Sequence, residues 1–250
     1  MVRHPLIDMG SFPIYNVMAG IGLISALLVL MHNLKDYNLR KPEEDRLLLL
    51  LAIAFVTGMG LSNVGNWFIM PGALDLPLLL RIKSAGLSFY FGLIGFLGTA
   101  TFLLKAFRYD VGMYLNAVVP SMLLFHGFGR IGCSLGGCCY GKIVNWNVFN
   151  TIFIERFPAR EIEAILLFIG FFVTQYVIKE RRLVFYLYAY PVTRFLLEFG
   201  RGDNRGVLIT SVLSPSQIIS ILIISITTVY MLCAFAVKVD SKHGIRNLHM

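Results

Sequence analysis

Four long stretches of the chain are apolar and carry no charged residue. They are residues 12–31, 47–70, 84–104 and 111–129, with lengths of 20, 24, 21 and 19 residues. A helix of about 20 apolar residues crosses the hydrocarbon core of a bilayer. Only 14% of the 250 residues are charged, which is too few to cover a soluble globule of this size. The sequence therefore predicts an integral membrane protein.

Three further segments extend this pattern. One is apolar from 164 to 178, the next covers 183–200, and the last covers 214–237. The last begins with Ser214-Pro215-Ser216-Gln217, in which Ser214 and Gln217 have the spacing of a capping box at a helix start. We therefore predict an all-α, polytopic fold with about seven transmembrane helices. Residues 1–250 are expected to form a single membrane domain.

The distribution of Lys and Arg between the loops predicts the orientation. Twelve lie on the side that holds the C-terminus, nine lie on the other side, and Arg194 lies within a predicted span. The positive-inside rule then places the N-terminus outside and the C-terminus in the cytoplasm, with a short outer loop at 142–157 and a frayed tail at 238–250. The first apolar run is too long for a signal peptide. The net charge of +8 fits cytoplasmic loops and anionic lipid, and no motif indicates nucleic-acid binding.

The segment 126–142 contains six glycines among its seventeen residues. Each glycine weakens a helix by about 1 kcal/mol relative to alanine, but lets the backbone approach a ligand closely. Arg130 ends the fourth predicted helix, where its guanidinium can bind a phosphate, and His126 lies on the same helical face. The glycines expected to allow backbone approach are Gly129, Gly132 and Gly141. Tight helix packing with a snorkelling arginine is the alternative.

A second set of charged residues lies within the predicted spans. Arg194, Glu198 and Arg201 share one helical face, and charges inside a span normally face a polar cavity or each other. We expect Arg194 to bind an anion opposite Arg130, with Glu198 holding the arginines in orientation. A purely structural Arg194–Glu198 pair is the alternative. Glu163, near a helix start, has either a dipole-complementing or a catalytic role.

The remaining polar candidates are tyrosines and cysteines. Tyr15 and Tyr90 lie within spans, where interhelical hydrogen bonding is the default role of a hydroxyl. Cys133, Cys138 and Cys139 are close together in the sequence, which is compatible with packing, a disulfide, a reactive thiol, or a metal site with His126 as the fourth ligand.

Several ordered blocks resemble the prolipoprotein diacylglyceryl transferase family over roughly residues 15–219. Gly129-Arg130-Ile131-Gly132 and Gly141 resemble the family's G-R-[IL]-G-N-F-x-N-x-E-x-x-G signature. The blocks 158–163, 194–201, 89–95 and 213–219 resemble its H-P-S-Q-L-Y-E, F-R-x-x-x-E-F-x-R, F-H-G-G-L-I-G and S-x-x-Q-x-x-S patterns. The chain departs from these patterns at Cys133 and Cys138, which replace Asn and Glu, and at Tyr90 and Phe157, which replace His.

The resemblance implies an enzyme of the bacterial inner membrane. Such an enzyme moves the diacylglyceryl group of phosphatidylglycerol, or of another anionic phospholipid, to a cysteine thiol in the signal-peptide segment of a prolipoprotein. Arg130 and Arg194 would bind the phosphate, His126 or Tyr90 would handle the proton, and no cofactor or metal is expected. The further substrate-binding residues would be Arg201, Glu163, Tyr15 and the three glycines. A divergent relative with another acceptor, a lipid or anion transporter, and a thiol-dependent membrane oxidoreductase are the alternatives.

Overall fold

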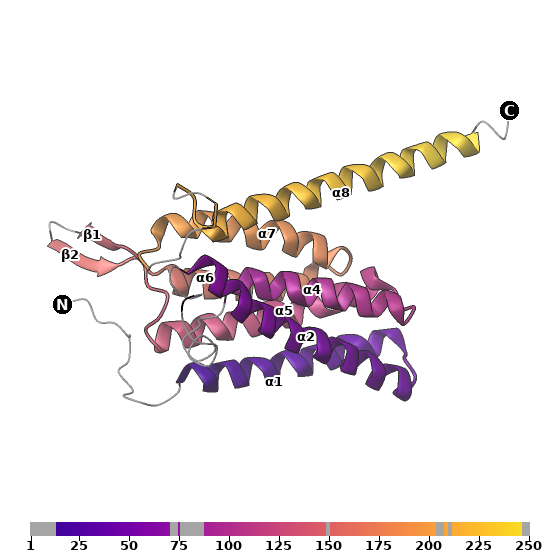
Figure 1. The fold of residues 1–250 in the computed structure, drawn as a ribbon, viewed down its shortest axis with the longest axis horizontal. Coiled ribbons are helices and arrows are strands. Elements are labelled where there is room, and N and C mark those ends of the chain that lie inside the picture. The colour runs from indigo at the N-terminus through magenta and orange to yellow at the C-terminus, as the bar shows by residue number, and fades with distance from the viewer. Residues whose placement is uncertain are drawn as a thin grey trace.

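The structure is a computed structural model that describes residues 14–70, 75, 88–148, 151–203, 208–209 and 212–246. Its main helices are α1 (Ile14–Leu34), α2 (Lys41–Ile69), α4 (Phe89–Ala106), α5 (Val111–Leu135), α6 (Ala159–Phe172), α7 (Arg182–Leu197) and α8 (Pro215–Arg246). Three short helical segments follow α1, α6 and α7, namely η1 (Lys35–Tyr37), η3 (Val173–Val177) and η4 (Glu198–Gly200). The strands β1 (Ile143–Val148) and β2 (Thr151–Arg156) pair as an antiparallel hairpin. Figure 1 shows these elements.

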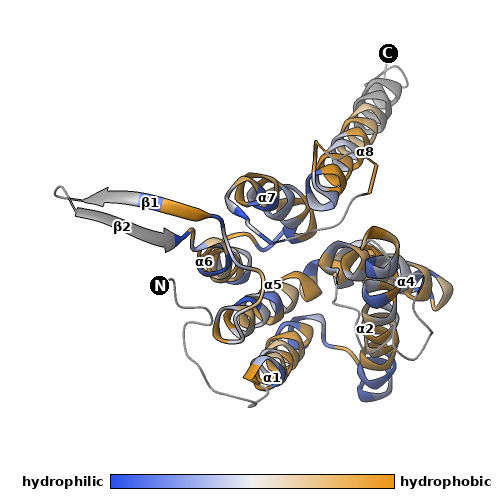
Figure 2. Ribbon diagram, turned by 60° about the vertical axis from the view of Figure 1, so that its left-hand side comes forward, coloured by the Kyte–Doolittle hydropathy of each residue, from blue (hydrophilic) through white to orange (hydrophobic). Residues whose placement is uncertain are grey.

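Apolar side chains cover the outside of the helices. Within the described residues, five helices are long and apolar enough to cross a membrane, and they comprise α1 with η1, α2, α4, α5 and the first part of α8. Large apolar side chains on them are exposed, including Ile24 at 63%, Val56 at 69% and Phe102 at 69%, and Figure 2 shows apolar residues along each of these helices. Such a surface is stable in lipid and not in water. The chain is therefore a helical, multi-pass membrane protein.

Helix α5 occupies the centre of the bundle. It packs against α1 and α6 and also contacts α7, while α2 pairs with α4, and α8 pairs with α7. Fifteen of its residues are buried, which is why its polar positions face protein instead of lipid. The start of α5 is fixed by Asp110, whose carboxylate accepts a hydrogen bond of 2.7 Å from the backbone N–H of Met113, a typical N-cap. The buried residues of α5 include Gly132, Cys133 and Ser134 near its end, so this part of the helix also belongs to the interior.

Each of the seven apolar regions predicted from the sequence contains a helix. The predicted capping box at the start of α8 is confirmed, because the Gln217 N–H donates to the Ser214 hydroxyl at 3.2 Å and the Ser214 N–H donates to the Gln217 side chain at 3.1 Å. Most of the segment 142–157, expected to be a short loop, forms the β1–β2 hairpin. Helix α8 continues to Arg246 into the tail that we expected to fray, and 247–250 lie outside the described residues.

The two ends of the bundle carry different structures. The hairpin and the start of α8 lie at one end, and the turn between α1 and α2 and the C-terminal end of α8 lie at the other (Figure 1). The predicted orientation rests on the Lys and Arg residues of the loops. Four of them lie outside the described residues, namely Arg3, Arg81, Lys83 and Arg205. The end of α5 and the start of α6 lie at the hairpin end, so the candidate site is near that end.

Candidate active site

A buried carboxylate lies where α5, α6 and α7 meet. Glu163, in the second turn of α6, is 0% exposed. Its Oε1 atom lies 3.0 Å from Nη2 of Arg130 on α5 and accepts a hydrogen bond of 3.3 Å from the hydroxyl of Tyr190 on α7. A buried charge needs partners of this kind, because an isolated ion away from water is strongly unfavourable. Glu163 thus links three helices.

Two further arginines approach the other oxygen of this carboxylate. Nη1 of Arg194, on α7, lies 3.9 Å from Oε2 of Glu163, and Nη1 of Arg201, just after η4, lies 3.8 Å from it. All three arginines are buried, with Arg130 the most exposed at 7%. Arg130 and Arg194, predicted to act on one headgroup, therefore face the same carboxylate, and Arg201 joins them.

Arg194 and Arg201 each have a second carboxylate partner. Nη2 of Arg194 lies 2.5 Å from Oε2 of Glu198 and donates to the Ser216 hydroxyl at 3.3 Å. Arg201 donates two hydrogen bonds to Asp203, at 3.0 and 3.1 Å, which is the bidentate geometry that guanidinium favours. Burial raises the pKa of the Asp203 carboxyl, and the adjacent Arg201 opposes that rise.

The carboxylate that contacts Arg130 differs from the one that we expected to orient it. We expected Glu198 to hold both arginines, but its ion pair is with Arg194, and Glu163 contacts Arg130. With Asp203 included, three guanidinium groups face three carboxylates. The positive and negative charges of the network are therefore equal in number. An anion can enter it without leaving an excess of negative charge only if one carboxylate moves away or takes up a proton.

Several buried donors in this network have no hydrogen-bond partner within the described part of the chain. These atoms are Nε of Arg130, Nη1 of Arg194 and Nη1 of Arg201. Arginine keeps its charge and all five of its N–H donors at any physiological pH. A phosphate placed between these guanidinium groups would accept hydrogen bonds from donors that are already buried and oriented.

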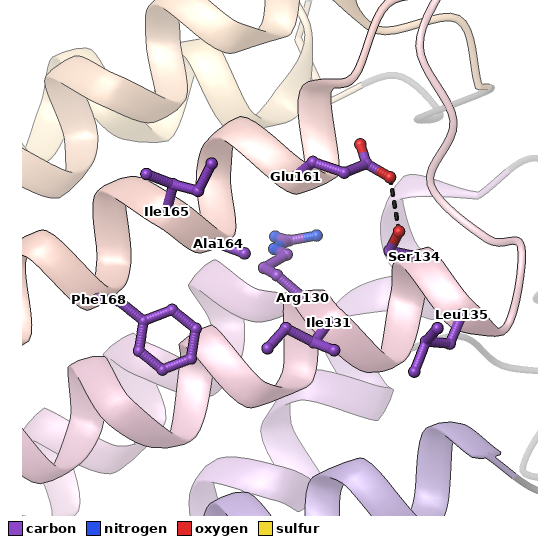
Figure 3. Close-up of a pocket in the computed structure, with 8 residues that line it drawn as sticks. All are labelled: Arg130, Ile131, Ser134, Leu135, Glu161, Ala164, Ile165 and Phe168. Carbon is purple, nitrogen blue, oxygen red and sulfur yellow. Dashed lines mark hydrogen bonds between the residues drawn. The ribbon is translucent and has the colours of Figure 1, made fainter. Parts of the chain in front are cut away.

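A cavity of about 240 Å³ borders Arg130 between α5 and α6. Its lining residues are Arg130, Ile131, Ser134, Leu135, Glu161, Ala164, Ile165 and Phe168. Figure 3 shows the Arg130 side chain pointing from α5 toward α6, with the Ser134 hydroxyl donating to Glu161 at 2.6 Å at one end of the cavity. Ile165 is 59% exposed, so the apolar wall reaches the outer surface of the bundle. The cavity thus combines a cationic group with an apolar, lipid-facing side.

The two predicted proton carriers have different surroundings. His126 stacks on Phe89 with ring centroids 3.8 Å apart, and its Nε2 lies 4.0 Å from Oε1 of Glu163. Both ring nitrogens of His126 are buried and lack a hydrogen-bond partner among the described residues. The Tyr90 hydroxyl instead forms a hydrogen bond of 2.6 Å with Ser220 on α8. The structure brings His126 to the carboxylate, whereas the Tyr90 hydroxyl is engaged with α8.

The glycines and Tyr15 occupy packing positions. A Cβ atom on Gly132 would lie 3.1 Å from the ring of Tyr15, so Gly132 lets α1 approach α5 closely. A Cβ atom on Gly141 would lie 2.0 Å from the backbone oxygen of Phe157, and real Cβ atoms never approach so closely. A Cβ atom on Gly129 would have no atom within 4 Å. The close approaches at Gly132 and Gly141 are therefore to protein.

Some site residues were not singled out from the sequence. Tyr190, Asp203 and Ser216 contact the charged network directly. Tyr190 lies four residues before Arg194, a spacing that places both on one helical face, and this signal could have found it. No sequence pattern predicts that Glu163 lies at the centre of the network, because its position depends on how three helices pack.

The three cysteines after Arg130 also gather in space. The sulfur atoms of Cys133, Cys138 and Cys139 all lie within 4.8 Å of one another, and all three thiols are free. Hydrogen bonds from the other two thiols lower the pKa of Cys139 and outweigh its burial, and the charges of Arg130 and Arg201 act in the same direction. The cluster thus borders the arginine network.

Comparisons with known proteins identify the family of this chain. The model of the family described as prolipoprotein diacylglyceryl transferase matches residues 5–233. A phosphatidylglycerol–prolipoprotein diacylglyceryl transferase of Clostridium tetani is 33% identical over 227 residues, which cover 85% of this chain and 89% of that protein. A second relative with this activity in its name, from Clostridium perfringens, is 32% identical and covers 84% and 86% of the two chains. A third, from Campylobacter jejuni, is 27% identical and covers 88% and 89%. This chain belongs to the prolipoprotein diacylglyceryl transferase family.

Proposed function

We propose that this protein transfers the diacylglyceryl group of phosphatidylglycerol to the thiol of a prolipoprotein cysteine. The observation that carries the proposal is the placement of Arg130, Arg194 and Arg201 around buried Glu163, with guanidinium donors free of hydrogen-bond partners within the described residues. The names of the relatives support the two substrates. The signal-peptide segment around the cysteine is the part of the acceptor that we expect the protein to bind.

The donor lipid would bind with its phosphodiester between the arginines. Arg130 borders the cavity, whose other walls include the apolar residues Ile165 and Phe168 of α6. The acyl chains can then remain in the bilayer while the headgroup reaches the buried charges. Tyr15 packs on Gly132, and the backbones at Gly141 and Arg201 pair in an isolated β-bridge, so in this proposal these residues fix the walls of the site.

The reaction is a displacement at carbon. The acceptor sulfur attacks the glyceryl carbon that is esterified to the phosphate, a carbon–sulfur bond forms, and the carbon–oxygen bond breaks. Glycerol 1-phosphate leaves with the electron pair. Negative charge grows on the leaving phosphate, and preorganised guanidinium groups stabilise such charge in a buried site.

The thiol must lose a proton for this attack, and Glu163 is the acceptor that we propose. Its Oε2 atom has no hydrogen-bond partner among the described residues. The incoming phosphodiester adds a negative charge to a network in which three arginines already face three carboxylates, and the thiol proton neutralises one of those carboxylates. His126, 4.0 Å from Glu163, relays the proton, while Tyr90 supports the site through Ser220.

We further propose seven spans in one membrane domain, with the hairpin end outside. The connections at the opposite end carry Lys35, Arg40, Lys105, Arg108 and Arg181, and cytoplasmic loops are enriched in Lys and Arg. Helices α6 and α7 would cross the bilayer together with η3 and η4. The protein then lies in the bacterial inner membrane, with its site near the outer surface, where a translocated acceptor can reach it.

A transfer assay with purified protein tests this function. Phosphatidylglycerol labelled in its glycerol headgroup is mixed with a lipobox peptide, and mass spectrometry follows the peptide while the released label is counted. The proposal predicts equal amounts of diacylglyceryl peptide and glycerol phosphate. A matched peptide with serine in place of the cysteine should give neither product. Label release without a thioether product would contradict the proposal.

A further inference from the structure

The cysteine cluster lies between two parts of the charged network. Cys133 follows Arg130 by three residues on α5, and Cys139 precedes the Tyr140–Gly141 segment that pairs with the chain around Arg201. The N–H of Gly202 donates to the Tyr140 carbonyl at 3.1 Å, which fixes this pairing. The three thiols are thus held beside the proposed donor site.

The backbone at the cluster is held in an uncommon conformation. Gly137 has φ 75° and Cys139 has φ 59°, and this left-handed conformation is unfavourable for a residue other than glycine. Arg160 donates to the carbonyl oxygens of Cys133 at 3.3 Å and Cys138 at 2.9 Å. A buried arginine and a strained turn therefore bring the two ends of the 133–139 segment together.

The sulfur geometry suits a thiophilic metal ion. Four ligands at a zinc–sulfur distance of about 2.3 Å place tetrahedral sulfurs about 3.8 Å apart, and the sulfurs here lie within 4.8 Å of one another. Small side-chain rotations close that difference. Within the described residues, no His, Asp or Glu joins this group of potential ligands, so three protein ligands leave one coordination position open.

We propose that Cys133, Cys138 and Cys139 bind one Zn²⁺ ion, and that the open fourth position binds the thiol of the acceptor. Thiolate ligands select zinc and other soft ions over Mg²⁺ or Ca²⁺. Cys138 is exposed, so an external ligand can reach the ion. Three thiolates and one Zn²⁺ carry a net charge of −1, against −3 for the three thiolates without the ion.

This inference rests in its second part on the proposed transfer reaction. A thiol that binds Zn²⁺ loses its proton, which Glu163 accepts as in the proposed reaction, and the sulfur remains bound as thiolate. The zinc-bound sulfur then forms the carbon–sulfur bond as the carbon–oxygen bond of the lipid breaks, and the thioether product dissociates because a thioether is a weaker ligand than a thiolate. No electron is gained or lost by the metal.

Cobalt binding tests the site without an activity assay. The full chain in nanodiscs is reduced, stripped with a chelator and titrated with Co²⁺, whose sulfur-to-cobalt charge-transfer absorption reports thiolate ligation. We expect one Co²⁺ per chain, displaced by one Zn²⁺. Loss of a residue that only supports a metal ligand weakens metal binding by roughly 10–100-fold. Cys138→Ser removes a ligand itself, at an exposed position, and should weaken Co²⁺ binding by more than that. Cys233→Ser, at the exposed cysteine of α8, is the matched control and should bind like the wild type.

Three outcomes would overturn the metal site. They are an absence of charge-transfer absorption while all thiols titrate as free, unchanged binding in a folded Cys138→Ser/Cys139→Ser variant, and equal loss of binding in Cys233→Ser.

The open position is tested by adding the lipobox peptide to the cobalt form. The cysteine peptide should change the visible cobalt spectrum and the serine peptide should not, and equal spectra would refute that part. Metal binding without lipid transfer would instead refute the proposed function alone.

Discussion

Nη2 of Arg130 on α5 lies 3.0 Å from Oε1 of Glu163 on α6, and both side chains are buried. This ion pair joins the two helices that form the cavity, and it shares its carboxylate with the arginines of α7 and of the segment after η4. A buried pair of this kind contributes little net stability, but removing one partner leaves an uncompensated charge. The same contact therefore matters for the fold and for the proposed chemistry.

Arg130 should be required for transfer beyond its positive charge. We expect Arg130→Ala to remove about 2–4 kcal/mol of transition-state stabilisation. This loss lowers kcat/KM for phosphatidylglycerol by roughly 30- to 1000-fold. Arg130→Lys should recover part of this loss, since lysine keeps the charge without the paired donors. Thermal unfolding of each variant separates this effect from instability, and wild-type rates in Arg130→Ala would remove Arg130 from the mechanism.

Glu163→Gln should separate binding from chemistry. The substitution keeps the shape and removes the proton acceptor, so transfer should fall by about 100-fold or more. Binding of labelled phosphatidylglycerol should be retained, because the arginines lose a competing negative charge. Glu180→Gln, at an exposed position, controls for the chemical change itself. Loss of lipid binding with unchanged turnover of the bound lipid would contradict this assignment.

The Tyr190 hydroxyl should have a smaller, measurable effect. It donates to Glu163 at 3.3 Å, and one such hydrogen bond contributes about 1 kcal/mol. Tyr190→Phe should therefore reduce the transfer rate by roughly fivefold. Tyr186→Phe is the comparison, since the Tyr186 ring stacks on Tyr190. Equal effects of the two substitutions would point to ring packing and not to the hydroxyl.

Two glycines of the same motif should respond in opposite ways to alanine. A Cβ atom on Gly141 would lie 2.0 Å from a backbone oxygen of Phe157, whereas one on Gly129 would meet no atom within 4 Å. Gly141→Ala should lower the melting temperature and the activity. Gly129→Ala should leave activity intact and favour the helix by about 1 kcal/mol. A loss of lipid binding in Gly129→Ala would restore the ligand-approach role that the sequence predicts for it.

The sequence predicts the apolar helices and the capping box because both depend on local patterns. The sequence also points to Arg194, because a charge within an apolar span is conspicuous, and to Arg130, because it ends a predicted helix inside a glycine-rich segment. The sequence analysis predicts a loop where the β1–β2 hairpin lies. The β-branched residues that flank Phe149-Asn150 in the sequence favour strands instead. The central role of Glu163 could not be read from the sequence, because three arginines reach it from separate segments that only packing brings together.

The central claim is that Arg130 and Arg194 hold one phosphate together, and a double-mutant cycle on kcat/KM for phosphatidylglycerol tests it most directly. Arg130→Ala, Arg194→Ala and the double variant are compared with the wild type, with folding checked for each. Residues that share one bound group show interaction energies of about 0.5–3 kcal/mol, so the double variant should lose less than the sum of the single losses. Strictly additive losses, or a single variant with the wild-type value, would contradict the account.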